Sequence, residues 1–167
     1  MTKKIILGVD PGLGVSGFGI LMKDQGKVFL VDYGYLKMNP TKPLSERVTQ
    51  FHDFFVTKIQ THKVTELALE TPFLGKNTQS FLKLGYLRGI LYLLAHQNSL
   101  TIHEFAPTEV KQSVTGYGAA SKDQVANVIL RLFPRLELPD KLDVTDALAV
   151  TLCGLWQRND LLGKKSI

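Results

Sequence analysis

The stretch that most constrains the fold runs from Ile5 to Gly19, IILGVDPGLGVSGFG, where an apolar segment leads into an aspartate and a Pro-Gly turn. The apolar segment, 5–9, is typical of a central strand that is covered on both faces. Pro11 favours an extended conformation at Asp10 and ends the strand there. Because side chains alternate along a strand, Asp10 shares a face with Gly8, and we expect this face to be open, with room for a metal ion, water or a ligand backbone. Taken alone, the pattern also fits an ordinary hairpin turn.

Length and composition fit one globular domain. The chain has 167 residues, of which 44% are hydrophobic, and this is enough to bury a substantial core. A net charge of +5 favours a polyanionic partner, and nucleic acid is the first to consider. Cys153 is the only cysteine, which excludes an intrachain disulfide and a cysteine zinc cluster. The four histidines lack metal-ligand spacing, so we interpret each as an ordinary surface or core residue.

The chain shows no internal repeat, long linker or low-complexity segment. We expect one domain over 1–158, followed by a basic, flexible tail over 159–167. The N-terminal MTKK leads directly into a strand, and the longest apolar runs are too short to cross a bilayer. We therefore expect a cytoplasmic protein without membrane association.

Periodicity and turn residues predict an α/β fold. Three strands come first and form an antiparallel meander, and two later strands are reached through helical crossovers. The result is a mixed sheet of three antiparallel and two parallel strands with helices on both faces. The expected strands are 5–10, 15–22, 27–37, 64–70 and 100–105, and the expected helices are 44–61 with a start at Thr41 or Ser45, 78–97, 107–114, 122–133 and a buried one at 144–156.

Two pairs of glycines occupy positions where glycine weakens the element. Gly17 and Gly19 share one face of the second strand, so a close-approaching backbone or ligand is expected there. Gly85 and Gly89 lie four residues apart in the long helix, where each glycine costs roughly 1 kcal/mol. This second pair predicts a close-packed neighbour, either the sheet of the same chain, which we favour, or a partner subunit.

Four acids stand beside apolar runs, where an unpaired carboxylate is costly. Asp10 and Glu70 end strands, and Asp143 and Asp146 begin the last helix, three residues apart and therefore on one face. An aspartate at a helix start is commonly only a cap, but the set as a whole requires a cation. Since the donors are all oxygens, the expected metals are Mg2+ or Mn2+. Two such ions about 4 Å apart can activate water and stabilise the leaving oxygen in phosphodiester hydrolysis.

Four segments, GVDPGLGVSGFG, ETPFLGKNTQSFLKLGYLRG, APTEVKQSVTGYGAASKDQV and DVTDALAV, resemble the RuvC family of bacterial Holliday junction resolvases, in matching order over nearly the whole chain. The resemblance implies an RNase H-like fold and a homodimer that makes paired, symmetric nicks in four-way junction DNA during recombination and repair, leaving 5′-phosphate and 3′-hydroxyl ends. It implies that Asp10, Glu70, Asp143 and Asp146 are catalytic metal-binding acids, with two Mg2+ ions for which Mn2+ substitutes. It further implies the branch-migration proteins RuvA and RuvB as partners.

The resemblance also suggests DNA-contacting residues. Phe73 matches an aromatic residue that lies against unpaired bases at the junction centre, and Lys111 and Lys122 match basic residues near the scissile phosphate. Lys76, Lys83 and Arg88 are expected to contact the DNA backbone. Each also has a simpler interpretation, as a packed aromatic or as a solvated charge. Glu109 and Thr145 depart from the family pattern without affecting the four acids.

Three alternatives remain open. A different RNase H-like nuclease, such as a YqgF-type RNA-processing enzyme, is disfavoured by the stretch 73–88, and a preference for junction over RNA would exclude it. An ATPase of the actin and sugar-kinase type shares an Asp-led, glycine-rich first hairpin but needs a second phosphate loop and a longer chain. A junction-binding module without catalysis is expected to have lost at least one acid, and all are present.

Overall fold

The computed structural model describes residues 3–72, 78–137 and 143–157. Its five-stranded sheet has the order β3-β2-β1-β4-β5. The meander is antiparallel, and β4 and β5 are parallel to β1, as the sequence predicts. The strands are β1 (Lys4–Asp10), β2 (Val15–Asp24), β3 (Lys27–Lys37), β4 (Glu66–Glu70) and β5 (Thr101–Phe105).

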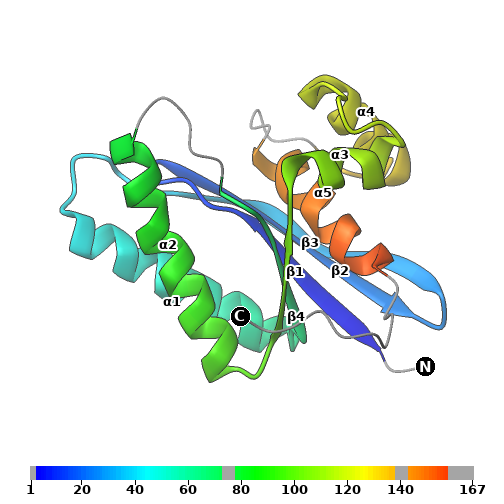
Figure 1. Ribbon diagram of the computed structural model, residues 1–167. Coiled ribbons are helices and arrows are strands. Elements are labelled where there is room, and N and C mark those ends of the chain that lie inside the picture. Colours follow the sequence, from blue (N-terminus) through cyan, green and yellow to red (C-terminus); the bar gives the residue numbers. More distant parts are fainter. Residues whose placement is uncertain (1–2, 73–77, 138–142, 158–167) are drawn as a thin grey trace.

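Helices cover both faces of the sheet (Figure 1). One face packs against α1 (Leu44–His62) and α2 (Thr78–Gln97), and the other against α3 (Pro107–Thr115), α4 (Lys122–Leu132) and α5 (Asp143–Trp156). Strand β1 contributes alternate residues to the two cores: Leu7 and Val9 face α1 and α2, whereas Ile6 faces α5. Both faces of β1 are therefore buried, which explains its continuous apolar run.

The start of α1 differs from the prediction. The helix is preceded by Pro43 in an extended conformation, and no side chain caps it, so neither Thr41 nor Ser45 has the expected role. Thr41 instead bonds to Asn39 in the preceding turn, with its backbone N 3.0 Å from Asn39 Oδ1. Among the described residues, no helix is both long and apolar enough to traverse a bilayer.

Helix α5 lies directly on glycines of the two central strands. Gly8 pairs with Gly19 across β1 and β2, and Asp10 pairs with Gly17. A Cβ atom placed on Gly8 would lie 2.0 Å from Thr151 Oγ1, and one on Gly17 would lie 2.0 Å from the Asp143 carbonyl oxygen. The expectation of an open face beside Gly8 is thus wrong, because α5 fills it. The expectation of a close-approaching backbone is confirmed at Gly17, whereas at Gly19 the closest atom belongs to the Leu148 side chain, 2.5 Å from an added Cβ.

The glycines of α2 have the opposite environment. A Cβ atom on Gly85 or Gly89 would meet nothing within 4 Å, so the interpretation that they pack against the chain's own sheet is wrong. They instead line an open apolar groove between α1 and α2, together with Leu44, Ser45, Val48, Tyr86, Ile90 and Leu93. We call this the α1/α2 groove. Its apolar lining lies on the surface, with Leu93 50% and Tyr86 53% exposed.

Candidate active site

The fold brings the predicted acids to one edge of the sheet. Strands β1 and β4 are parallel neighbours, so Asp10 and Glu70, at their carboxyl ends, lie on the same side. The glycine contacts place the first turn of α5, with Asp143 and Asp146, against the end of this pair. Three of the four acids line a cavity of about 260 Å3, whose other lining residues are Val9, Pro107, Val110, Lys111, Lys122, Val125, Ala149 and Val150.

The electrostatics of Asp10 show how closely the acids are grouped. Its pKa is raised from 3.8 to about 7, first by burial and then by repulsion from Asp146, Asp143 and Glu70, whereas Lys122 opposes the rise. The pKa of Glu70 is also raised, mainly by burial and by Asp146, and Lys122 and Lys111 counteract this shift. A carboxylate at the position of Asp10 therefore needs positive charge nearby.

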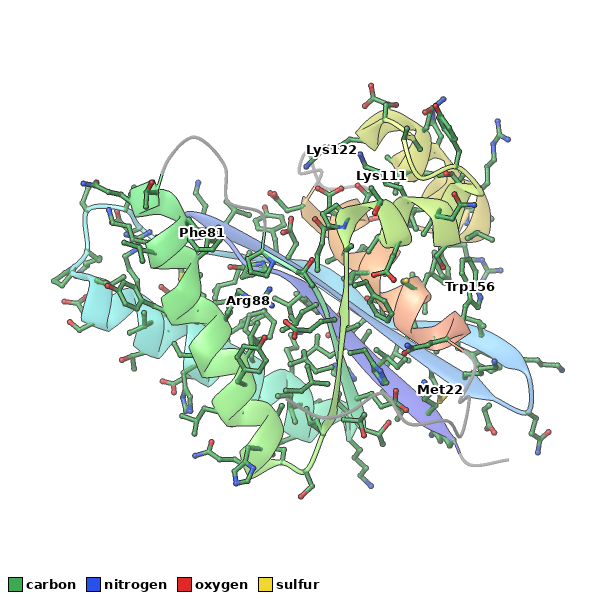
Figure 2. All side chains as sticks on the ribbon, viewed as in Figure 1. Met22, Phe81, Arg88, Lys111, Lys122 and Trp156 are labelled. Atoms are coloured by element: carbon green, nitrogen blue, oxygen red, sulfur yellow. The ribbon has the colours of Figure 1, made fainter. Side chains whose placement is uncertain are left out.

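Two lysines supply positive charge at the cavity. Lys122, the first residue of α4, places Nζ 2.7 Å from Asp146 Oδ2 although its side chain is 69% exposed. This hydrogen bond is the main cause of a raised Lys122 pKa. Lys111 reaches the same cavity from α3, and Figure 2 shows the two lysines close together above the edge of the sheet. Both sequence-predicted lysines are thus at the acids.

The chemistry of this site fits a hard divalent cation. Its potential ligands are carboxylate oxygens, the donors that Mg2+ and Mn2+ prefer. The Asp10 pKa is raised first by burial and then by the neighbouring carboxylates, so a bound cation would favour the ionised form. In the conformation described, no three acidic or histidine side chains of the described residues converge closely enough to hold one ion together. The Lys122 contact involves Asp146 Oδ2, so a cation that binds this oxygen competes with Lys122 for it.

The other predicted DNA-contacting residues are distributed differently. Lys83 is exposed on α2, in agreement with a surface role. Phe73, Lys76 and the tail 159–167 lie outside the described residues.

Arg88 is not on the surface, which corrects its prediction as a DNA-backbone contact. It is only 7% exposed, and its guanidinium donates to the backbone oxygen of Glu70 and to the carboxylate of Glu104. A buried Arg must be paired, and Arg88 is paired within the chain. Figure 2 shows it on the side of α2 that faces the strands.

Sequence reasoning missed several contacts around the site. The pairing of Lys122 with Asp146 joins residues 24 positions apart, and no local pattern marks it. Glu109 accepts a hydrogen bond from the Ala106 N–H at 2.7 Å, so its departure from the family pattern serves the start of α3. This contact was recognisable from the three-residue spacing at a helix start. Thr145 is only 1% exposed, which places it in the packing of α5.

Comparison with known proteins agrees with this arrangement. The family model "Crossover junction endodeoxyribonuclease RuvC" matches residues 6–154. The protein of that name from Pelodictyon phaeoclathratiforme is 40% identical over 151 residues, covering 90% of this chain and 79% of the relative. The one from Legionella pneumophila is 38% identical over 157 residues, covering 94% and 90%.

Solved structures give the same result. Thermus thermophilus RuvC in complex with a Holliday junction substrate superposes with a TM-score of 0.82 at 26% identity, covering 90% of this chain and 92% of the other. The yeast mitochondrial Holliday junction resolvase Ydc2 shares the fold, with a TM-score of 0.63 at 12% identity over 89% of this chain and 76% of the other. With a family match over most of its length and relatives 40% and 38% identical over 90% and 94% of it, the chain belongs to the RuvC family of crossover junction endodeoxyribonucleases.

Proposed function

We propose that this protein resolves Holliday junctions, hydrolysing phosphodiester bonds in two strands of a four-way DNA junction by paired, symmetric nicks that leave 5′-phosphate and 3′-hydroxyl ends. The observation that carries the proposal is the grouping of Asp10, Glu70 and Asp146 with two lysines at one cavity. The fold alone would not be sufficient, because one fold hosts many activities and function must be argued from the site.

The four acids are proposed to hold Mg2+, with Mn2+ as a substitute. In such a site the bound ions supply Lewis-acid chemistry, lowering the pKa of a water and stabilising the leaving oxygen. Asp10 lies at the centre of the set, because Asp146, Asp143 and Glu70 all raise its pKa. Glu70, exposed at the end of β4, is proposed to orient the attacking water. Asp143, in the first turn of α5, is the fourth carboxylate of the proposed site.

The lysines are proposed to act on the scissile phosphate. Lys122 is exposed, and its ammonium contacts Asp146, so an incoming phosphate and Asp146 compete for the same charge. When Lys122 turns toward phosphate, Asp146 is released to act as a ligand. Lys111, half-buried at the same cavity, is proposed to offset charge that develops on the phosphate. Lys83, Lys76 and Phe73 are proposed to contact DNA outside the cavity.

A homodimer is proposed to use the α1/α2 groove. A second copy would cover exposed Tyr86 and Leu93, and the absence of side chains at Gly85 and Gly89 lets a partner backbone approach closely. A two-fold dimer suits a four-way junction because such a junction presents two equivalent strands. RuvA and RuvB are the proposed protein partners by family membership.

The test is cleavage of a mobile four-way DNA junction in Mg2+ and in Mn2+, compared with a linear duplex of identical sequence. We expect paired nicks in the junction only. Asp10→Asn should abolish cleavage while junction binding in a gel-shift assay persists, because the substitution removes a metal-binding charge and leaves the surface lysines intact.

Phe29→Glu, an exposed substitution on β3, serves as the matched control and should cleave like the parent. Tight junction binding without cleavage in either metal would contradict the proposal and favour a binding module. Preferential cleavage of RNA would favour an RNA-processing nuclease.

A further inference from the structure

We infer that Arg88 is a positioning residue for Glu70, acting from the opposite face of the sheet through the backbone of the residue it orients. The inference rests on the proposed function, since Glu70 matters as a ligand only if the site is catalytic. In this role Arg88 does not contact DNA. Glu104 and Tyr92 hold the Arg88 side chain in place.

The contacts of Arg88 converge on the end of β4. Its Nη1 donates to the backbone oxygen of Glu70 at 2.6 Å. Its Nη2 donates to Glu104 Oε1 and lies 3.3 Å from the hydroxyl of Tyr92, which also donates to Glu104. The network thus joins β4, α2 and β5, three elements that follow one another along the chain.

The peptide group after Glu70 is held on both sides. Its carbonyl oxygen accepts from Arg88, and its N–H, which belongs to Thr71, donates to the Phe105 carbonyl oxygen at 2.8 Å. Strand β1 ends at Asp10, and the register between β1 and β4 ends with the pair Val9 and Leu69, so the ladder does not continue to Glu70. Arg88 supplies the hydrogen bond there. Fixing this peptide fixes the direction of the Glu70 side chain.

The direction of a side chain at a strand end matters for this site. Glu70 points to the face on which α5 lies, as Ala68 does, whereas Arg88 reaches the strand from the α2 face. Arg88 therefore influences the cavity without entering it, and it is absent from the residues that line the cavity. A small rotation of the Glu70 peptide would move its carboxylate away from Asp10 and Asp146.

The side chain must be arginine for this role. A planar guanidinium donates to two acceptors in fixed directions, and Arg88 uses one nitrogen for Glu70 and another for Glu104. Lysine keeps the charge that Glu104 requires but has a single nitrogen and no fork. Arg88→Lys thus separates the charge of Arg88 from its geometry, and Arg88→Met removes both.

The experiment compares the parent with Arg88→Lys, Arg88→Met and Lys83→Met, an exposed lysine of the same helix. Mn2+ affinity is measured directly by electron paramagnetic resonance titration, junction affinity by gel shift, folding by thermal melting, and kcat and KM by junction cleavage. For Arg88→Lys we expect Mn2+ affinity and kcat to fall about tenfold, the effect of losing one charge-assisted hydrogen bond. Junction affinity and KM should stay at the parental value.

Lys83→Met should give the reverse pattern, weaker junction binding at parental Mn2+ affinity. High Mn2+ should partly restore the kcat of Arg88→Lys, which a merely structural defect would not show. If Arg88→Met unfolds, Arg88→Lys still decides the question.

If folded Arg88→Lys bound Mn2+ with the affinity of the parent and had the same kcat, the inference would be overturned. Weakened junction binding at parental Mn2+ affinity would return Arg88 to the group of DNA contacts. If the parent failed to cleave junctions, the proposed function would fail, and the Mn2+ titration would still test Arg88 by itself.

Discussion

The two faces of the sheet use glycine in opposite ways. On the α5 face, the helix packs so closely against Gly8, Gly17 and Gly19 that a Cβ atom on any of them would collide with it. On the α1/α2 face, Gly85 and Gly89 look into open space. The first group of glycines brings acidic side chains together within one chain, whereas the second leaves an apolar groove unfilled. A glycine pair in the sequence therefore does not by itself show whether a neighbouring element of the same chain packs against it.

The difference follows from where the charged residues lie. The α5 face ends in carboxylates that repel each other, so the helix that carries two of them must be held by packing. All residues from Val144 to Leu155 are buried except Asp146, and this burial stabilises the placement of the acids. The residues that line the α1/α2 groove carry no charge, and the groove remains available for a partner.

Gly17→Val gives the largest expected effect on this comparison. Its side chain would clash with the Asp143 carbonyl and push the start of α5 away from Asp10. We expect junction cleavage to fall at least about a hundredfold, because displacing a catalytic group by an ångström is enough for such a loss. Unfolding in urea should show a loss of more than about 2 kcal/mol from overpacking.

Gly14→Ala is the matched control, since a Cβ atom there meets nothing within 4 Å. It should cleave and unfold like the parent. If Gly17→Val cleaved junctions at the rate of the parent, the close packing of α5 on these glycines would not be what positions the acids.

Asp10→Asn should remove a pH dependence of stability. Because the folded pKa of Asp10 is about 7 and the ordinary value is 3.8, the folded state holds a proton that the unfolded state releases between these values. Without metal, the free energy of unfolding therefore falls as pH rises from about 4 to 7, by up to about 1.4 kcal/mol per pH unit from this group.

Urea unfolding in EDTA at pH 5 and pH 8 measures the effect. The free energy of unfolding of the parent minus that of Asp10→Asn should be smaller at pH 8 than at pH 5. Addition of Mg2+ should stabilise the parent more at pH 8, because ionised carboxylates bind the cation. An identical pH slope in the two proteins would show that Asp10 titrates normally.

Leu93→Glu tests the other face. Leu93 is 50% exposed, so a charge there should change the stability of the single chain by no more than about 0.5 kcal/mol. It should nevertheless disrupt the proposed dimer, which sedimentation velocity would detect as a change in mass. Phe29→Glu, which replaces an equally exposed apolar residue on β3, should leave the mass unchanged. A dimer that survives Leu93→Glu would place the interface elsewhere.

Gly89→Ala gives the smallest expected effect and contrasts directly with Gly17→Val. In the Leu93→Glu background, where no partner should occupy the groove, it should raise the free energy of unfolding by up to about 1 kcal/mol, because alanine favours the helix and meets no neighbour. Chemical denaturation measures the difference. A destabilisation would mean that the groove closes on this glycine within one chain.

The sequence by itself determined the elements and the ends at which the acids lie. Strand β3 and the start of α5 next to Asp143 follow from alternation, helical periodicity, and proline and glycine chemistry, which act over a few residues. The gathering of Asp10, Glu70, Asp143 and Asp146 was predictable because strand ends and a buried helix start allow few arrangements.

The tertiary structure alone decided what fills the space between these elements. The sequence predicted an open face at Gly8, but α5 packs against this glycine. It predicted Arg88 as a surface charge, but Arg88 donates a hydrogen bond to the backbone of Glu70. It gave no indication that Lys122 would bond to Asp146. Each of these outcomes depends on a neighbour that is many residues away in the chain. Local periodicity carries no information about which distant side chain arrives at a given position, because that is fixed by the packing of whole elements against one another.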